Sequence, residues 1–266
     1  MNQYALQKVL SKSNIGELRY FDSIGSTNDE ALAWAAGGAK DLSIVIADEQ
    51  TQGRGRLNRK WFTPKGSALA FSIILRPSAS LRPHLSRTVG LAALSIAGAC
   101  LTHGLAPRIK WPNDILLNGK KTAGILIETV WSGADVDSLV IGVGVNVYKP
   151  SVPPPDLLHF PATSLEDELG GEPPAREEIL REILSAFISW RERMDTNELI
   201  KAWEQILAFR GEQVQVQAGG GSVLEGEAPI SGRLLGLETD GSLRLRDMHD
   251  KSVIVRFGDV SLRPTA

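Results

Sequence analysis

The stretch DILLNGKKTAGILIETVW, residues 114–131, decides the fold of the chain around it. Asn118 and Gly119 stand between two apolar runs, and both residue types tolerate the positive φ angles that a tight two-residue turn requires. The stretch therefore predicts a β-hairpin. Lys121 follows Asp114 by seven residues across the turn, so the hairpin brings these two side chains near one another.

Strands and helices are mixed on both sides of this hairpin. Residues 85–104 predict a long buried helix, and residues 26–38 predict a helix with a capping box of Thr27 and Glu30 at its start. Short apolar runs predict strands at residues 17–24, 43–49, 67–76 and 138–147. Because strands and helices do not alternate strictly, the expected fold class is α+β around a mixed sheet.

The composition changes after residue 147. Four prolines within six residues exclude regular helix or central strand, so residues 148–163 are expected to be a surface excursion. Two amphipathic helices are predicted at 175–194 and 198–209. Short alternating runs with glycine-rich turns follow and predict a small β-barrel. We therefore expect a catalytic domain at 1–209 and a barrel domain at 210–266.

Positive charge is concentrated in one part of a chain whose net charge is only −2. Residues 50–113 hold ten cations and no acidic residue, and four of those cations lie in GRGRLNRKW, residues 53–61. The segment suits an anionic ligand, whereas the low net charge argues against a protein that coats nucleic acid.

The remaining composition favours a cytoplasmic protein without a membrane segment. The N-terminus lacks the apolar core of a secretory signal, and the longest apolar run, 89–101, is shorter than the roughly 20 residues of a membrane span. The single cysteine, Cys100, cannot form an internal disulfide and is expected to be buried.

No single nucleotide-binding motif explains the basic loop. Asn58 occupies the position where G-x-G-x-x-G requires glycine, and Asp114 occupies the first glycine position of a P-loop ending in GKKT.

Four segments in one order, however, resemble the biotin protein ligases: STN at 26–28, GRGRLNRKW at 53–61, KWPNDILLNGKKTAGILIE at 110–128 and IGVGVN at 141–146. The resemblance covers about residues 20–148, and the C-terminal part resembles that family's SH3-like barrel more weakly. It implies an enzyme that activates biotin with ATP, in the presence of Mg²⁺, to biotinyl-5'-AMP. The biotinyl group then passes to a lysine of a biotin carboxyl carrier protein.

The resemblance leaves a homodimer open. Specific DNA binding is not expected, because the roughly 25 residues before STN are too few for a helix-turn-helix domain.

The resemblance also assigns roles residue by residue. Lys121, Asp114 and Arg56 are the expected catalytic residues, with Asp114 either holding Mg²⁺ or accepting the proton of the incoming lysine amine. Trp61 is the expected adenine platform. Biotin binding is assigned to Ser26, Thr27, Asn28, Gln50, Gly53, Arg54, Gly55, Arg56, Lys121 and Gly124, and ATP binding to Arg54, Arg56, Trp61, Lys110, Asn113 and Asn146. Asn58 departs from the family's usual glycine, and we expect the loop to tolerate it.

The expected chemistry accounts for these residue types. Joining a carboxylate to the α-phosphate of ATP brings two anions together, and two unit charges about 4 Å apart repel by roughly 4 kcal/mol at an effective dielectric constant of about 20. Arg54 and Arg56 offer forked donors that offset this repulsion. Glycines beside them let the loop close, so we expect it to be mobile when empty and ordered when occupied.

Two other functions remain open at this point. A lipoate ligase or acyltransferase could share the fold, although the double-arginine loop and KWPND favour biotin. A non-enzymatic nucleic-acid-binding protein could use the basic stretch, but aromatics are scarce between Arg54 and Lys110 and no reading motif is present.

Overall fold

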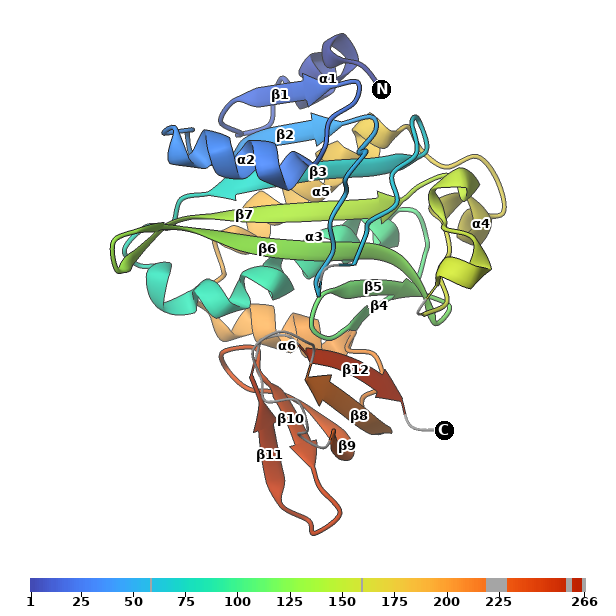
Figure 1. Cartoon of the computed structure of the whole chain (residues 1–266). Coiled ribbons are helices and arrows are strands. Elements are labelled where there is room, and N and C mark those ends of the chain that lie inside the picture. The colour runs from blue at the N-terminus through green and yellow to red at the C-terminus, as the bar shows by residue number, and fades with distance from the viewer. Residues whose placement is uncertain (58, 159, 219–228, 257–259, 265–266) are drawn as a thin grey trace.

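The computed structural model describes residues 1–266 except 58, 159, 219–228, 257–259 and 265–266. Its largest element is a seven-stranded sheet in the order β1-β2-β3-β7-β6-β5-β4 (Figure 1). β1 and β2 pair in parallel, and all other neighbours in this sheet pair antiparallel. The strands are β1 (Leu18–Phe21), β2 (Ser43–Ala47), β3 (Ala68–Leu75), β4 (Pro107–Lys110), β5 (Asp114–Leu117), β6 (Lys120–Ser132) and β7 (Asp135–Asn146). The predicted mixed sheet is confirmed.

Different helices cover the two faces of this sheet. Successive side chains of a strand point to opposite faces, so one strand contributes to the core on each side. Leu69, Phe71 and Ile73 of β3 belong to one large core with α3 (Thr88–Thr102) and α5 (Arg176–Arg191). Ile74 belongs to a smaller core with α2 (Thr27–Ala36) on the other face. The long helix α3 is therefore interior, whereas α2 covers only part of the opposite face of the sheet.

The turn between β5 and β6 follows the sequence prediction. Asn118 has φ 47° and Gly119 has φ 75°, so both adopt the left-handed conformation that this turn requires. A register shift between Ile115 and Leu116 sets Asp114 opposite Gly124 and Leu116 opposite Lys121. The hairpin thus holds Asp114 and Lys121 at neighbouring positions.

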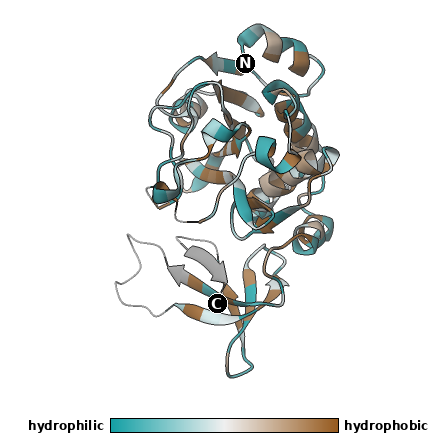
Figure 2. Cartoon of the chain, turned by 90° about the vertical axis from the view of Figure 1, so that its right-hand side faces the viewer, coloured by the Kyte–Doolittle hydropathy of each residue, from teal (hydrophilic) through white to brown (hydrophobic). Residues whose placement is uncertain are grey.

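A second, smaller antiparallel sheet lies at one end of the main body (Figure 2). Its order is β11-β10-β9-β8-β12, from β8 (Gln213–Ala218), β9 (Ile230–Leu237), β10 (Leu243–Arg246), β11 (Ser252–Val255) and β12 (Val260–Pro264). The α+β fold class with a small all-β part is confirmed. The domain boundary at residue 209 and the closure of this sheet into an SH3-like barrel stay predictions.

Hydrogen bonds from two buried side chains of the main body reach the turn between β9 and β10 of the second sheet. Arg87 Nε donates to the carbonyl oxygen of Thr239 at 2.8 Å, and Trp111 Nε1 donates to that of Gly241 at 3.1 Å. Trp111 lies between Lys110 and Pro112 in the KWPND segment. The turn between β9 and β10 therefore contacts the chain that leads to Asp114.

Several helices were not predicted from the sequence. Helix α1 (Gln3–Leu10) has an Asn2 N-cap, and α4 (Leu165–Leu169) follows the proline-rich excursion, which itself contains the short 3-10 helices η2 (Lys149–Ser151) and η3 (Pro155–Leu157). The helices predicted at 175–194 and 198–209 correspond to α5 and to α6 (Asn197–Gln205).

The apolar helix predicted at 85–104 is split in two. It begins as a 3-10 helix, η1 (Arg82–Arg87), and continues as α3. Among the described residues, the combined stretch Arg82–Thr102 is long and apolar enough to cross a membrane, but 67% of its apolar window is buried inside the protein. Packing within this chain accounts for its composition.

Candidate active site

The predicted site residues gather on the sheet face that carries α2. The segment between β2 and β3 crosses β7 and β6 on this face (Figure 1). Strand register places small residues side by side there, because Gly144 pairs with both Ala70 and Gly124, and Gly142 pairs with Ser72. With little side-chain volume on neighbouring strands, the sheet forms a low strip beside α2. We call it the glycine floor; it consists of Ala70, Gly124, Gly142 and Gly144.

Uncharged polar side chains line the end of the floor near α2. Gln50 Oε1 accepts hydrogen bonds from Thr27 N at 2.8 Å and Thr27 Oγ1 at 3.1 Å. Ser72 Oγ lies 2.6 Å from Asn28 Oδ1 and 2.8 Å from Thr27 Oγ1. Thr27, Asn28 and Ser72 are buried, as is Ser26 before them. This polar end offers hydroxyl and amide groups in a site shielded from water.

Two details of the polar end depend on the tertiary structure. The predicted capping role of Thr27 is wrong, because Ser26 is the N-cap residue and the Thr27 hydroxyl contacts Gln50. Gly142 cannot carry a side chain without rearrangement, since a Cβ there would lie 2.2 Å from Asn28 Oδ1. The glycine in IGVGVN therefore leaves room for the Asn28 carboxamide.

Charged side chains meet at the opposite end of the floor. Asp114 is buried and accepts from Lys121 Nζ on Oδ1 at 2.6 Å and from Lys110 Nζ on Oδ2 at 3.2 Å. Burial alone would raise the pKa of Asp114, but the two ammonium groups outweigh it and hold the pKa of that carboxyl below its ordinary value. Two cations and one anion leave a net positive charge, which suits an anionic ligand.

The lowered pKa bears on the two predicted roles of Asp114. A carboxylate whose pKa lies below its ordinary value is a weak proton acceptor at neutral pH. Both of its oxygens already face ammonium groups, so neither is directed at a metal ion. The geometry instead favours Asp114 as the residue that fixes the positions of Lys110 and Lys121.

Among the described residues, no group of three or more His, Cys, Asp or Glu side chains could hold a metal ion. Mg²⁺ prefers one or two carboxylates together with the phosphates of a nucleotide, so this donor set fits a metal that arrives bound to ATP better than a resident ion.

Two asparagines border the charged end. Asn113 donates through Nδ2 to the carbonyl oxygen of Ile125 at 2.7 Å, and its Oδ1 accepts from Arg56 Nη1 at 3.3 Å. Asn146 is buried and donates to the carbonyl oxygen of Thr163 at 3.1 Å. The predicted residues Arg56, Asn113 and Asn146 therefore lie around the same end as Lys121, brought together from three separate segments.

The 53–61 segment forms a roof over the floor. Trp61 N donates to the Gly53 carbonyl at 2.8 Å, and Gly55 N donates to the Arg59 carbonyl at 2.7 Å. Arg54 and Lys60, which lie between these two hydrogen bonds, form an antiparallel β-bridge. The segment is therefore a short hairpin rather than an unstructured loop. Asn58, where the sequence departs from the family pattern, lies outside the described residues.

Glycine is required at one of the two predicted positions in this hairpin. A Cβ at Gly53 would lie 2.4 Å from the Trp61 carbonyl oxygen. A Cβ at Gly55 would meet only ordinary contacts, 3.5 Å or longer. Gly53 therefore permits the close approach of the two hairpin strands, and Gly55 is not constrained in this way.

Trp61 is the part of the roof that touches the floor. A Cβ at Gly144 would lie 2.2 Å from Trp61 Nε1, and one at Gly124 would lie 3.1 Å from Trp61 Cζ3. Lys121 Nζ lies 5.3 Å from the centre of a Trp61 ring, and the buried Trp61 Nε1 has no hydrogen-bond partner among the described residues. The ring thus sits between the polar and charged ends, and its predicted role as adenine platform stays a prediction.

Arg54 makes contacts that its sequence environment did not predict. Its Nη2 lies 2.6 Å from Asp29 Oδ1 and 2.8 Å from Glu128 Oε2, and its Nη1 lies 2.9 Å from Glu128 Oε1. Hydrogen bonding to Glu128 holds the pKa of Arg54 above its usual value. Two carboxylates therefore neutralise this guanidinium, which makes it a poorer anion ligand than Lys121.

Three residues of the site were missed in the sequence. Ser72 lies under Thr27, and Asp29 and Glu128 hold Arg54. Glu128 could have been found, because it alternates with Gly124 and Leu126 on one face of the predicted strand. Ser72 could have been found as a lone hydroxyl in an otherwise apolar strand.

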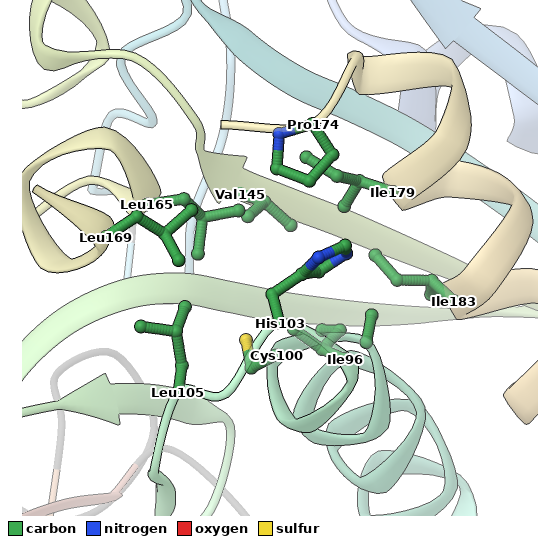
Figure 3. A pocket seen from close by; sticks show the side chains of 11 residues that line it. Ile96, Cys100, His103, Leu105, Val145, Leu165, Leu169, Pro174, Ile179 and Ile183 are labelled. Carbon is green, nitrogen blue, oxygen red and sulfur yellow. The ribbon is translucent and has the colours of Figure 1, made fainter. Parts of the chain in front are cut away.

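One enclosed cavity among the described residues lies on the opposite face of the sheet. Apolar side chains of β7, α3, α4 and α5 line it, including Val145 and Leu165, together with His103 and Cys100 (Figure 3). Its volume of about 10 Å³ barely admits one water molecule. Burial raises the pKa of Cys100 to about 12, so this thiol is not activated, and the cavity is a packing gap rather than a substrate site.

Comparisons with known proteins agree with this arrangement. The biotin/lipoate A/B protein ligase family model matches residues 20–146. A biotin–[acetyl-CoA-carboxylase] ligase of Paracoccus denitrificans is 34% identical over 86% of this chain and 94% of its own length. The bifunctional ligase/repressor BirA of Bacillus spizizenii is 35% identical over 86% of this chain and 69% of its own length.

The likeness extends to three dimensions. The structure of a biotin protein ligase from Aquifex aeolicus in complex with biotin and ATP matches with a TM-score of 0.79 and 26% identity, covering 94% of this chain and 99% of the other.

Proposed function

Since the chain belongs to the biotin protein ligases, within the biotin/lipoate A/B protein ligase family, we propose that the glycine-floored site carries out both steps of ATP-dependent protein biotinylation. The observation that supports this most directly is the Lys110–Asp114–Lys121 cluster, where a net positive charge stands at one end of the glycine floor, while hydroxyl and amide side chains line the other end. Biotin has the matching shape, with a neutral polar ring at one end and a carboxylate at the other.

In this proposal the ring lies at the polar end. Ser26, Thr27, Asn28 and Gln50 offer hydroxyl and amide groups to the ureido atoms, as predicted, and Ser72 supports Thr27 and Asn28 from below. The aliphatic chain passes beside the Trp61 ring, which itself fills the space over Gly144. The carboxylate then reaches Lys121.

The first step joins two anions. A carboxylate oxygen of biotin attacks the α-phosphorus of ATP, the bond to the β-phosphate oxygen breaks, and pyrophosphate leaves. Lys121, Lys110 and Arg56 offset the charge that gathers there, and Asp114 keeps both lysines in place. Mg²⁺ enters with the nucleotide as part of this substrate.

The second step transfers the biotinyl group. The neutral amine of a carrier lysine attacks the carbonyl carbon of biotinyl-5'-AMP, the bond to the phosphate oxygen breaks, AMP leaves, and the new amide nitrogen gives up one proton to solvent. A roof that excludes water protects the mixed anhydride from hydrolysis until the carrier arrives. The lysine of a biotin carboxyl carrier protein is the acceptor in this proposal, and a homodimer and a cytoplasmic location stay predictions.

Intact mass tests the proposal. The protein is incubated with ATP, Mg²⁺, biotin and a carrier domain, and the carrier should gain the mass of one biotinyl group. The same reaction with lipoate in place of biotin tests the alternative substrate. A carrier that gains lipoyl but not biotinyl mass would refute the assignment of biotin to the polar end.

A further inference from the structure

We propose that Asp29 and Glu128 are positioning residues that hold Arg54 and thereby fix the 53–61 hairpin over the site. We call these two side chains the carboxylate clamp. Glu128 receives both terminal nitrogens of Arg54 in a forked arrangement, at 2.8 and 2.9 Å, and Asp29 adds a contact at 2.6 Å. Forked arginine–carboxylate pairs fix orientation as well as distance.

The clamp connects three elements that are far apart in the sequence. Asp29 is on α2, Glu128 is on β6, and Arg54 is in the hairpin between β2 and β3. Arg54 bridges to Lys60, and the Trp61 amide bonds to the Gly53 carbonyl. A shift of Arg54 therefore moves the strand that carries Trp61, the side chain that contacts the glycine floor.

Glu128 also serves the polar end. Its Oε2 accepts from Asn28 Nδ2 at 2.7 Å, and the Oδ1 of the same Asn28 lies 2.6 Å from Ser72 Oγ. One carboxylate thus orients both the hairpin and the Asn28 carboxamide. If the ring of biotin lies at the polar end, as proposed above, binding of the ring and closure of the roof are coupled through Glu128.

The clamp redefines the part that Arg54 plays. Its guanidinium is neutralised by the two carboxylates, so Arg54 acts on the hairpin rather than on the anionic substrates. Asp29, Arg54 and Glu128 are partly exposed, with side-chain exposures of 57%, 40% and 25%, so each contact contributes modestly and the clamp can open. Such a contact suits a roof that must release product.

Two variants separate the functions of the clamp. Asp29→Asn weakens only the hold on Arg54, whereas Glu128→Gln weakens that hold and also changes the acceptor for Asn28. Glu30→Gln is a matched control, because Glu30 is next to Asp29 on α2 and pairs with Arg19 at the same 2.6 Å distance without touching the hairpin. Thermal unfolding of all three should stay close to that of the unmodified protein.

The first measurement is tryptic cleavage of the ligand-free protein after Arg54, Arg56, Arg59 and Lys60, mapped by mass. Both clamp variants should be cut about fivefold faster there, the change expected from a contact of about 1 kcal/mol, and Glu30→Gln should not. The KM for biotin should rise about fivefold in Asp29→Asn and more in Glu128→Gln, with kcat within about twofold.

Three results would overturn the inference. The hairpin of both variants could be cut no faster than that of the control, the KM for biotin could stay unchanged, or the KM for ATP could fall because a released Arg54 binds phosphate. The cleavage measurement needs no ligand, so it tests the clamp even if the assignment of biotin to the polar end fails.

Discussion

Gly144→Ala tests the contact between roof and floor most directly. A Cβ at position 144 would lie 2.2 Å from Trp61 Nε1 and Cε2 and 2.6 Å from Cζ2. Because carbon contacts become comfortable only near 3.5 Å, the indole must withdraw by more than about 1 Å. Gly144 lies on a central strand between β3 and β6, so the ring is the more mobile partner.

The magnitude follows from opposing terms. Overpacking of this kind costs about 1–3 kcal/mol, and replacing glycine in the unfolded chain recovers about 0.4–1 kcal/mol. We expect the free energy of unfolding to fall by about 1–2 kcal/mol. The KM for biotin should rise at least about tenfold, because the displaced ring no longer packs on the glycine floor of the proposed site.

The assay combines urea unfolding with pyrophosphate release at varied biotin concentration. Alanine substitutions at two other glycines serve as comparisons for the size of the steric clash. A Cβ at Gly124 meets only the flexible end of Lys121 and the edge of Trp61, at 3.1 Å, and one at Gly171 meets nothing within 4 Å. Gly124→Ala should therefore be mild and Gly171→Ala neutral.

The decisive comparison is made in a Trp61→Ala background. If the ring causes the clash, Gly144→Ala should cost nothing there, since the two changes share one contact. An equal loss of stability in both backgrounds would refute the packing of Trp61 on Gly144.

Three further predictions concern the charged end. Lys121→Ala should raise the activation free energy of adenylation by about 3–4 kcal/mol, and it should lower the melting temperature modestly because Asp114 would keep only Lys110. Pyrophosphate release and thermal melting of the variant test this. A turnover close to normal would show that Lys121 takes no part in the mechanism. The lowered pKa of Asp114 contributes stability that should be fully present above the pKa of Asp in the unfolded chain, about 3.9, and be lost as the pH falls through the pKa in the folded protein. The difference in unfolding free energy between the unmodified protein and Asp114→Asn should therefore be constant from about pH 5 to 8 and change only in acid. Arg56→Gly should weaken retention of the adenylate more than its formation, since it removes the contact with Asn113; a chase with unlabelled biotin and biotin scored on a bystander protein should both show more leakage than in the unmodified protein.

Local interactions made much of this protein predictable from its sequence. The Asn118–Gly119 turn depends on two backbone angles, and the strands of the main sheet follow from apolar runs, except β4, which the sequence analysis did not predict. The proximity of Lys121 to Asp114 follows from that turn, and the 2.6 Å between Lys121 Nζ and Asp114 Oδ1 agrees with it. The order of the four quoted segments was enough for the family, because each retains residue types that the chemistry requires.

Only the tertiary structure decided which groups these residues meet. Arg54 stands in a run of cations, yet its partners are Asp29, which is 25 positions before it in the chain, and Glu128, which is 74 positions after it. Strand register places Gly144 beneath Trp61, and the pairing of β4 with β5 brings Lys110 to Asp114, which Lys121 of β6 also contacts. Composition along a chain shows which charges are available, whereas long-range strand pairing and packing determine which of them are neutralised and which are left for a substrate.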